Sequence, residues 1–417
     1  MYIDKIKLEN FRTFLRSEID FVHPDQSFDR LEIPKPKLRN VNLLLGNNGS
    51  GKTTLLKAIA MAALGPAVSD ANLPIYRIIR RRSAQAKGAQ PEEASIKARF
   101  TTHEQDGHGT NYRPEVMESV VGISRRGEVE RVRWDHPDDK DWSPIFSSEN
   151  DAFFFVGYGA TRRVESQERV DPGARQVSSL LRAQRIRSLF EEAYSLMPLP
   201  LWLPKLESEN PGRFVQVKRL INRLLGGTGY KFTGERELGE YLFDRGGLAV
   251  PFPALSDGYR AFLGWVGDLL YHVCHTCPSG KMLWENRGIV MVDEIDLHLH
   301  PKWQMTVLPK LARALPNIQF ILTSHSPLIV GSLEWMNIMV MSPGPQSSTK
   351  PQRLVEPVHG LDADQVLLTD FFGLNTTRVD VKERQMKELT LKARSGSNEA
   401  ATKLLNLWSK GLEGVQA

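Results

Sequence analysis

A glycine-rich turn between an apolar run and a helix-forming run constrains this chain more than any other feature. The turn lies between Val41–Leu45 and Thr54–Leu64 and reads Gly46-Asn47-Asn48-Gly49-Ser50-Gly51-Lys52-Thr53. The glycines allow backbone N–H groups to turn inward around phosphate oxygens, and the following helix N-terminus adds positive potential. In this pattern the lysine reaches the β- and γ-phosphates, and the threonine hydroxyl binds Mg²⁺. The sequence therefore predicts a site for ATP or GTP at residues 46–54, with Thr53 on the metal.

The composition agrees with a soluble protein that has a large core. The chain has 417 residues, of which 41% are apolar and 25% are charged. Charged residues interrupt every long apolar stretch, and Met1 to Lys5 do not lead into the apolar segment of a signal peptide. Two cysteines fit a reducing compartment. We therefore expect a cytoplasmic protein without a membrane partner, and the net charge of +5 is a weak indication of an anionic one.

Two regions of the chain predict an α/β core. Residues 1–165 contain the phosphate-binding loop and three alternating segments, 95–101, 115–123 and 127–134, which indicate an antiparallel subdomain. The core resumes at residues 251–335, where further apolar strands alternate with helical patterns. We expect a mixed sheet flanked by helices.

The two remaining regions carry helical patterns. Residues 166–250 are expected to form a mainly helical insert. Residues 336–417 are expected to form a helical C-terminal extension for partner binding or self-association. Within that extension Leu404, Leu405, Leu407 and Trp408 share one predicted apolar face.

A pair of carboxylates follows the apolar run Ile289–Val292. These residues are Asp293 and Glu294. In a nucleotide-hydrolysing sheet the first carboxylate holds Mg²⁺ and the second polarises the attacking water. The sequence therefore predicts Asp293 as a metal ligand and Glu294 as the general base.

Two further segments allow more than one interpretation. Ser256, Asp257 and Gly258 open a helix, where they either form an anion site or simply cap the helix. His325 follows the apolar run 318–324 and either senses a γ-phosphate or has a structural role.

The order of these motifs resembles that of the ABC-type ATPases of the SMC/RecF/OLD class, over residues 1 to about 333. In that class two protomers sandwich two ATP molecules. The resemblance implies that Ser256, Asp257 and Gly258 act on ATP held by another subunit. It also implies that Glu294 is the catalytic base, His325 the switch histidine, and Asp296 the acid of the subunit contact.

Three segments resemble one bacterial branch of this class, the ATPases of Septu-type and retron-associated anti-phage defence systems. They are Asp293-Glu294-Ile295-Asp296-Leu297-His298-Leu299-His300-Pro301, Gly157-Tyr158-Gly159-Ala160-Thr161-Arg162, and Thr323-Ser324-His325-Ser326-Pro327. That resemblance implies a separate HNH-type nuclease as partner, and DNA or RNA bound directly or through it. No nuclease motif occurs in this chain.

Two departures from the class favour slow or conditional hydrolysis. The glutamine that usually contacts Mg²⁺ and water is missing from 157–163. Arg162 or Arg163 either contacts phosphate in its place or faces solvent, and Gln167 lies nearby. Asp257 replaces a glycine and brings an acid close to phosphate.

Two alternative functions stay open: a DNA-repair ATPase of the SMC/RecF kind, and a nucleotide-gated scaffold with little hydrolysis. The absence of long heptad repeats argues against an SMC protein with coiled-coil arms.

Overall fold

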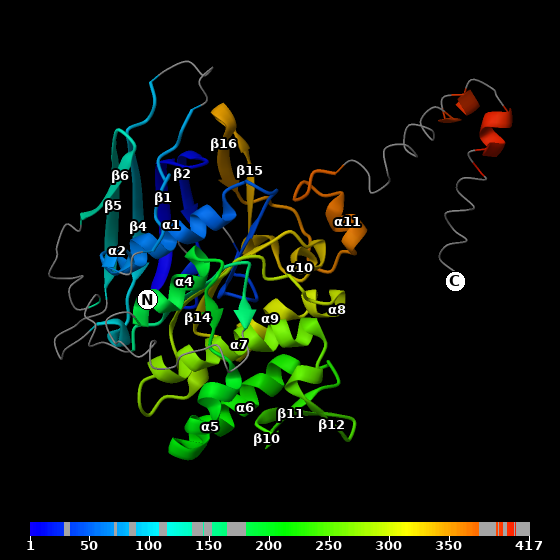
Figure 1. The fold of residues 1–417 in the computed structure, drawn as a ribbon. Coiled ribbons are helices and arrows are strands. Elements are labelled where there is room, and N and C mark those ends of the chain that lie inside the picture. Colours follow the sequence, from blue (N-terminus) through cyan, green and yellow to red (C-terminus); the bar gives the residue numbers. More distant parts are fainter. Residues whose placement is uncertain are drawn as a thin grey trace. The chain divides into compact units, whose positions relative to one another are not determined.

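The computed structural model describes most of the chain. The described residues are 1–28, 34–70, 73–82, 89–107, 115–135, 145, 152–164, 181–374, 389–390, 392–394, 398–403 and 405. The chain divides into two compact units, Met1–Ala363 and Asp364–Ala417. All the sheets that the described residues form lie in the first unit (Figure 1).

A six-stranded sheet forms the centre of the first unit, in the order β16-β15-β3-β14-β13-β7. Its strands are parallel except β16, which pairs antiparallel with β15. Parallel strands are covered on both faces, which explains why three of them read as continuous apolar runs. The strands are β3 (Val41–Leu45), β7 (Phe155–Tyr158), β13 (Gly288–Val292), β14 (Ile318–Ser324), β15 (Ile338–Gly344) and β16 (Ser348–Gln352).

The register of this sheet brings the phosphate-binding loop and the carboxylate pair together. Leu45 lies opposite Ser324, and Val292 lies opposite both Leu322 and Tyr158. The carboxyl ends of four parallel strands therefore meet at one edge. Ligands of open α/β sheets bind outside this edge.

A second, antiparallel sheet has the order β2-β1-β4-β5-β6 and confirms the expected antiparallel subdomain. Helix α1 (Lys52–Leu64) packs against β4, β5 and β14, and nearly all its side chains are buried. A helix that is apolar all round belongs inside a core, and each of its large side chains contributes roughly 1.5–3 kcal/mol on burial. The strands are β1 (Tyr2–Phe11), β2 (Phe14–Asp20), β4 (Glu93–Thr101), β5 (Val116–Arg126) and β6 (Val129–Asp135).

The region expected as a mainly helical insert also contains a sheet. Its helices are α4 (Leu181–Phe190), α5 (Leu199–Glu209) and α6 (Pro211–Leu225). A three-stranded antiparallel sheet follows, formed by β10 (Lys231–Glu237), β11 (Glu240–Arg245) and β12 (Leu248–Pro251). Glycines with positive φ at 239, 246 and 247 close its two hairpins. The short strands β8 (Arg163–Val164) and β9 (Ser195–Leu196) pair with each other.

The region expected as a helical extension begins with strands instead. β15 and β16 lie within 336–417 and complete the central sheet. The reason is that β3 would otherwise be an exposed edge strand, which β15 covers with its buried residues Ile338–Met341. Among the expected apolar residues of the last helix, Leu404, Leu407 and Trp408 lie outside the described residues, and Leu405 is exposed.

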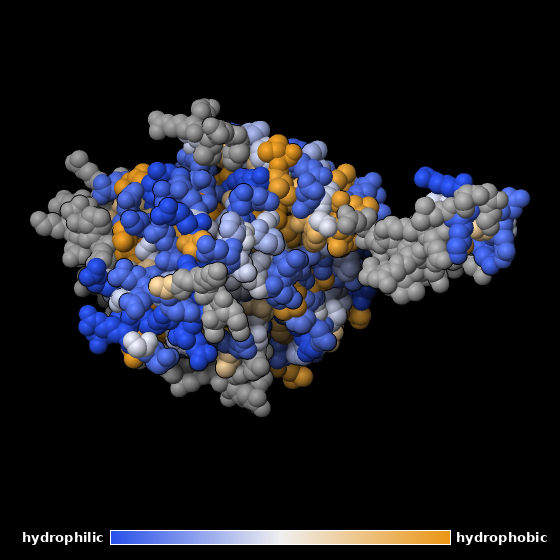
Figure 2. All heavy atoms as spheres, turned by 90° about the horizontal axis from the view of Figure 1, so that it is seen from above, coloured by the Kyte–Doolittle hydropathy of each residue, from blue (hydrophilic) through white to orange (hydrophobic). Residues whose placement is uncertain are grey.

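The described residues form further α-helices. They are α2 (Ala67–Asp70), α7 (Asp257–Thr276), α8 (Pro301–Gln304), α9 (Val307–Ala314), α10 (Pro327–Gly331) and α11 (Ala363–Leu367). Among the described residues, none of the helices has the length and apolar character needed to span a bilayer. Hydrophilic residues predominate on the face shown in Figure 2, with apolar residues in small separated groups.

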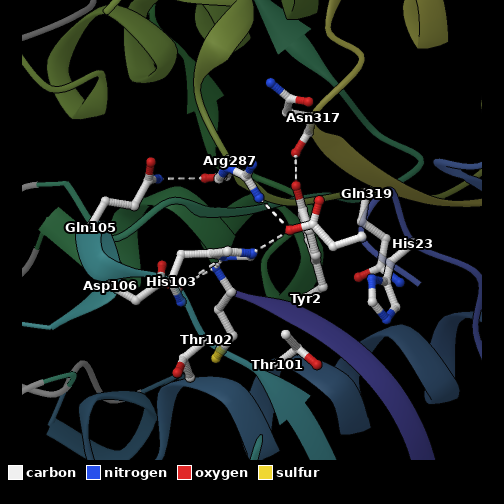
Figure 3. A network of polar contacts seen from close by, with 12 residues as sticks. Tyr2, His23, Thr101, Thr102, His103, Gln105, Asp106, Arg287, Asn317 and Gln319 are labelled. Atoms are coloured by element: carbon white, nitrogen blue, oxygen red, sulfur yellow. Dashed lines mark hydrogen bonds and ion pairs between the residues drawn. The ribbon is translucent and has the colours of Figure 1, made fainter. Parts of the chain in front are cut away.

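A polar network ties the antiparallel sheet to the segment that leads into β13 (Figure 3). The Asp25 carboxylate lies 3.0 Å from His103 Nε2 and pairs with the Arg287 guanidinium. The hydrogen bond from His103 and then the charge of Arg287 lower the pKa of Asp25 to about 2. Gln105 Nε2 donates to the Arg287 carbonyl at 2.8 Å. The network therefore fixes the start of the strand whose other end carries Asp293.

Candidate nucleotide-binding site

The turn between β3 and α1 has the backbone geometry of a phosphate-binding loop. Gly49 and Gly51 have φ values of 77° and 93°, in the left-handed region that favours glycine. A Cβ atom on Gly51 would lie 2.4 Å from Thr13 Oγ1. Both conformation and space therefore require glycine at position 51, immediately before the first turn of α1.

The Lys52 ammonium group lies inside this loop. Its Nζ donates to the carbonyl oxygens of Gly46 (2.7 Å) and Asn47 (3.2 Å) and lies 2.9 Å from His325 Nε2. An ammonium group has no lone pair, so Nε2 accepts and a neutral His325 carries its proton on Nδ1. Burial, and then the charge of Lys52, lower the pKa of His325, which favours this neutral form. Burial also lowers the pKa of Lys52.

Asp293 connects the loop to two strands through its carboxylate. Thr53 Oγ1 donates to Oδ2 at 2.6 Å, and Thr323 Oγ1 donates to Oδ1 at 2.6 Å. Thr323 Oγ1 also accepts a 2.7 Å hydrogen bond from the backbone N–H of Glu294. Asp293 is buried and Thr323 is completely buried, so these hydroxyls hold the carboxylate in one orientation.

Glu294 adopts a left-handed backbone conformation, with φ 49°. Such a conformation costs a non-glycine residue roughly 1–3 kcal/mol and occurs where surrounding contacts enforce it. Glu294 lines a pocket of ≈ 350 Å³ at the carboxyl edge of the sheet. The lining residues are Arg12, Thr13, Asn48, Gly49, Gly51, Lys52, Thr53, Thr54, Asp293, Glu294 and His325.

The pocket fits a nucleotide phosphate chain. Its volume is within the range of ligand sites, and it lies at the N-terminus of a 13-residue helix. Thr13 lines the pocket, and its Oγ1 atom is buried without a hydrogen-bond partner among the described residues. Buried hydroxyls of this kind normally have partners, so Thr13 Oγ1 is open to a bound ligand.

The same pocket fits Mg²⁺ through hard oxygen ligands. Thr53 Oγ1 and the Asp293 carboxylate lie side by side, as the sequence predicts for the metal. The described residues contain no group of three or more His, Cys, Asp or Glu side chains that could bind a metal ion. Mg²⁺ commonly uses one or two protein ligands and takes the others from phosphate and water, so this pair suits it.

The segment Ser256-Asp257-Gly258 lies outside this pocket, because none of its residues belongs to the lining. Ser256 is the exposed N-cap residue of α7, and its side chain makes no capping hydrogen bond. Asp257 pairs with Arg260 in the same helix. The plain-cap interpretation of the Ser256 hydroxyl is therefore wrong, and action on a nucleotide held by a second subunit stays a prediction.

Gly258 packs against the turn that follows Glu294. A Cβ atom at position 258 would lie 2.7 Å from the carbonyl oxygen of His298, a residue with φ 65°. In the same turn, Asp296 Oδ1 is buried and has no hydrogen-bond partner among the described residues. The role of Asp296 at a subunit contact stays a prediction.

Arg162 lies in the segment after β7 where the resembled class usually carries a glutamine. It neither lines the nucleotide pocket nor faces solvent, because its guanidinium group donates to backbone carbonyls of the carboxylate pair. Burial lowers the pKa of Arg162 to about 10, which leaves it charged at neutral pH. The Arg163 side chain and Gln167 lie outside the described part of the chain.

The sequence did not predict the contacts that four residues make in or next to this site, namely Arg12, Thr13, Arg162 and Thr323. Thr323 belongs to a strand and to a segment that resembles the bacterial branch, but no contact was predicted for it. Arg12 and Thr13 lie at the end of β1, and Arg162 carried no signal for binding backbone carbonyls. A polar residue next to the end of a buried parallel strand, such as Thr323, is the one signal that could have been used.

The fold and the site define the chain as a P-loop protein with the fold of the ABC-type ATPases. The fold is that of a solved structure titled "Crystal structure of the SmcHead bound to the C-winged helix domain of ScpA". The similarity has a TM-score of 0.51 at 14% identity and covers 85% of this chain and 98% of that chain. The expected fold class is therefore confirmed.

The chain belongs to the family described as "AAA domain, putative AbiEii toxin, Type IV TA system", whose model matches residues 41–331. A second model, described as "AAA ATPase domain", matches residues 1–65.

Curated relatives agree with the expected branch of this class. The Septu protein PtuA of Bacillus mycoides (strain KBAB4) is 26% identical over 399 residues, which are 92% of this chain and 46% of that protein. The "Retron Ec83 probable ATPase" of Escherichia coli is 33% identical over 105 residues, which are 25% of this chain and 19% of that protein. The "Retron Vc95 probable ATPase" of Vibrio cholerae serotype O1 biovar El Tor is 39% identical over 98 residues, which are 24% of this chain and 19% of that protein. The chain thus spans less than half the length of these relatives.

Proposed function

We propose that this chain binds ATP with Mg²⁺ and hydrolyses it. The observation that carries the proposal is one pocket that contains Lys52, Thr53, Asp293 and Glu294. Lys52 would bind the β- and γ-phosphates, and Thr53 and Asp293 would hold the metal, which neutralises phosphate charge. Glu294 would accept a proton from the attacking water. His325 would contact the γ-phosphate, from its position beside Lys52.

ATP would join two copies of the chain. The exposed Ser256 at the start of a 20-residue helix offers a hydroxyl, backbone N–H groups and a helix N-terminus, but not to the pocket of its own subunit. In a dimer, Ser256 and Gly258 would bind the ATP of the partner subunit, and Asp296 would lie at the subunit contact. Hydrolysis would then separate the subunits.

The biological role we propose is regulation of a separate nuclease in bacterial anti-phage defence. The proposal is supported by the similarity to a Septu protein and to two retron ATPases. The nuclease would be of the HNH type, with DNA or RNA bound directly or through it. The protein would act in the cytoplasm, and residues 336–417 would contribute to self-association or to partner binding.

The test of catalysis is the Glu294→Gln variant, measured for ATP binding and for phosphate release. We expect ATP binding to persist while hydrolysis falls by about 10²–10⁴-fold, the usual contribution of a general base. Glu235→Gln, at an exposed position of β10, is the matched control and should hydrolyse ATP at the unmodified rate. Equal rates in both variants would exclude Glu294 as the base.

Two further measurements test the dimer and the partner. Glu294→Gln with ATP should have twice the mass of the ATP-free protein, and mixed Ser256→Arg and Lys52→Ala proteins should regain part of the activity. When tagged Glu294→Gln protein is purified with ATP and Mg²⁺ from cells that carry its neighbouring genes, we expect a nuclease to co-purify in stoichiometric amount, identified by mass spectrometry. Recovery of replication or repair proteins without a nuclease would favour the DNA-repair alternative instead.

A further inference from the structure

Arg162 contacts the backbone of the carboxylate pair and is not among the residues that line the nucleotide pocket. Tyr158, the last residue of β7, accepts a 2.9 Å hydrogen bond from the Asp293 N–H through its carbonyl oxygen. The chain then continues through Gly159, where a Cβ atom would lie 2.3 Å from the Ser188 carbonyl oxygen. This tight path leads to Arg162, which lines a second, smaller pocket beside α7 and residues 297–299.

The guanidinium group binds the two peptide groups that flank the Glu294 Cα atom. Nη1 donates to the carbonyl oxygen of Asp293 at 2.5 Å, and Nη2 donates to the carbonyl oxygen of Glu294 at 3.0 Å. Nη1 also donates to Gly159 at 3.2 Å, which anchors the group to its own loop. The planar arginine side chain reaches the two carbonyls with two separate nitrogens in a fixed geometry, which the single nitrogen of a lysine does not reproduce.

Holding both peptide planes fixes the φ and ψ angles of Glu294. These angles determine where the Cα–Cβ bond points, and therefore where the carboxylate lies in the pocket. The left-handed φ of 49° shows that this direction is not the one a free chain would adopt. Thr323 holds the same residue as well, because its Oγ1 atom accepts a 2.7 Å hydrogen bond from the Glu294 N–H.

We propose that Arg162 is a positioning residue, which holds the Glu294 backbone in its left-handed conformation so that the carboxylate faces the bound nucleotide. This inference rests on the proposed ATP hydrolysis. It differs from the role of a phosphate or metal ligand, because the Arg162 guanidinium group binds backbone carbonyls and does not line the nucleotide pocket.

The test compares Arg162→Lys with Arg353→Lys. Arg353 is a matched control because its guanidinium group also joins two backbone carbonyls, those of Met336 and Asp20, away from the nucleotide pocket. Loss of a buried guanidinium group should affect the folding of both variants alike. We expect only Arg162→Lys to lose turnover, by on the order of tenfold to a hundredfold, with an unchanged Kd for ATP. A Kd that weakens in step with kcat would instead make Arg162 a nucleotide ligand and overturn the proposal.

A crystal structure of each variant gives a readout that does not depend on turnover. We expect the Glu294 φ angle to leave the left-handed region in Arg162→Lys and to stay there in Arg353→Lys. An unchanged φ angle in Arg162→Lys would overturn the proposal. If Arg162→Lys does not fold, Arg162→Gln takes its place, with the same expected turnover, Kd for ATP and Glu294 φ angle. Absence of hydrolysis in the unmodified protein would contradict the proposed function, whereas the Glu294 φ angle in the variants would still test the role of Arg162.

Discussion

Thr323 is a buried hydroxyl that joins the two acidic residues of the site. It donates to Asp293 Oδ1 at 2.6 Å and accepts from the Glu294 N–H at 2.7 Å, and it has no exposed surface. Valine has nearly the same shape without the hydroxyl. Thr323→Val therefore removes both hydrogen bonds while the packing of β14 is kept.

The expected loss of stability follows from these two contacts. A hydrogen bond to a charged group contributes about 1.5–3 kcal/mol, and a buried N–H left without a partner costs about 1–3 kcal/mol. Since the two contacts share one hydroxyl, we expect Thr323→Val to lower the free energy of unfolding by about 2–4 kcal/mol. This is a large part of the roughly 5–15 kcal/mol that stabilises a typical domain.

Thr323→Ser is the control, because it keeps the hydroxyl and removes only a methyl group. Loss of a buried methyl group costs about 1 kcal/mol. Both variants are measured by urea denaturation of the nucleotide-free protein, followed by tryptophan fluorescence. A valine variant as stable as the serine variant, or more stable, would show that the hydroxyl does not hold the carboxylate pair.

Two other predictions concern contacts outside the pocket that contains Lys52. Gly258→Ala places a Cβ atom 2.7 Å from the His298 carbonyl oxygen, so we expect ATP turnover to fall on the order of tenfold. Gly212→Ala, where the nearest atom lies 3.7 Å from the added Cβ atom, should leave turnover unchanged. Full turnover in Gly258→Ala would show that the packing of Gly258 against His298 does not affect catalysis. Because the pKa of Asp25 is about 2, below its ordinary value of 3.8, its carboxylate stabilises the fold above about pH 4, and this contribution is lost as the pH falls through 2. The side chain is 39% exposed, so solvent screening reduces the contribution to about 1 kcal/mol. Asp25→Asn should therefore cost more stability at pH 7 than at pH 3 in urea titrations, and an equal cost at both would exclude the ionised pair.

The sequence by itself determined the parts of this protein that are contiguous along the chain. The turn from Gly46 to Thr53 and the pair Asp293 and Glu294 are local patterns, in which residue type and spacing already specify backbone conformation and chemistry. The parallel strands β3, β13 and β14 were also readable, because strands covered on both faces must be apolar throughout. Because parallel strands have their carboxyl ends at the same edge of a sheet, one could also expect their polar ends to meet.

The tertiary structure alone decided the contacts that join distant segments. Arg162 and Asp293 are 131 positions apart, and Thr53 and Asp293 are 240 apart. Nothing in the local sequence distinguishes an arginine that binds carbonyls from one that binds phosphate or faces solvent. The strands β15 and β16 were missed for a related reason, since their place depends on the free edge of β3 rather than on their own pattern. Local spacing encodes the chemistry of each segment, whereas the packing of the sheet and its loops selects which segments meet.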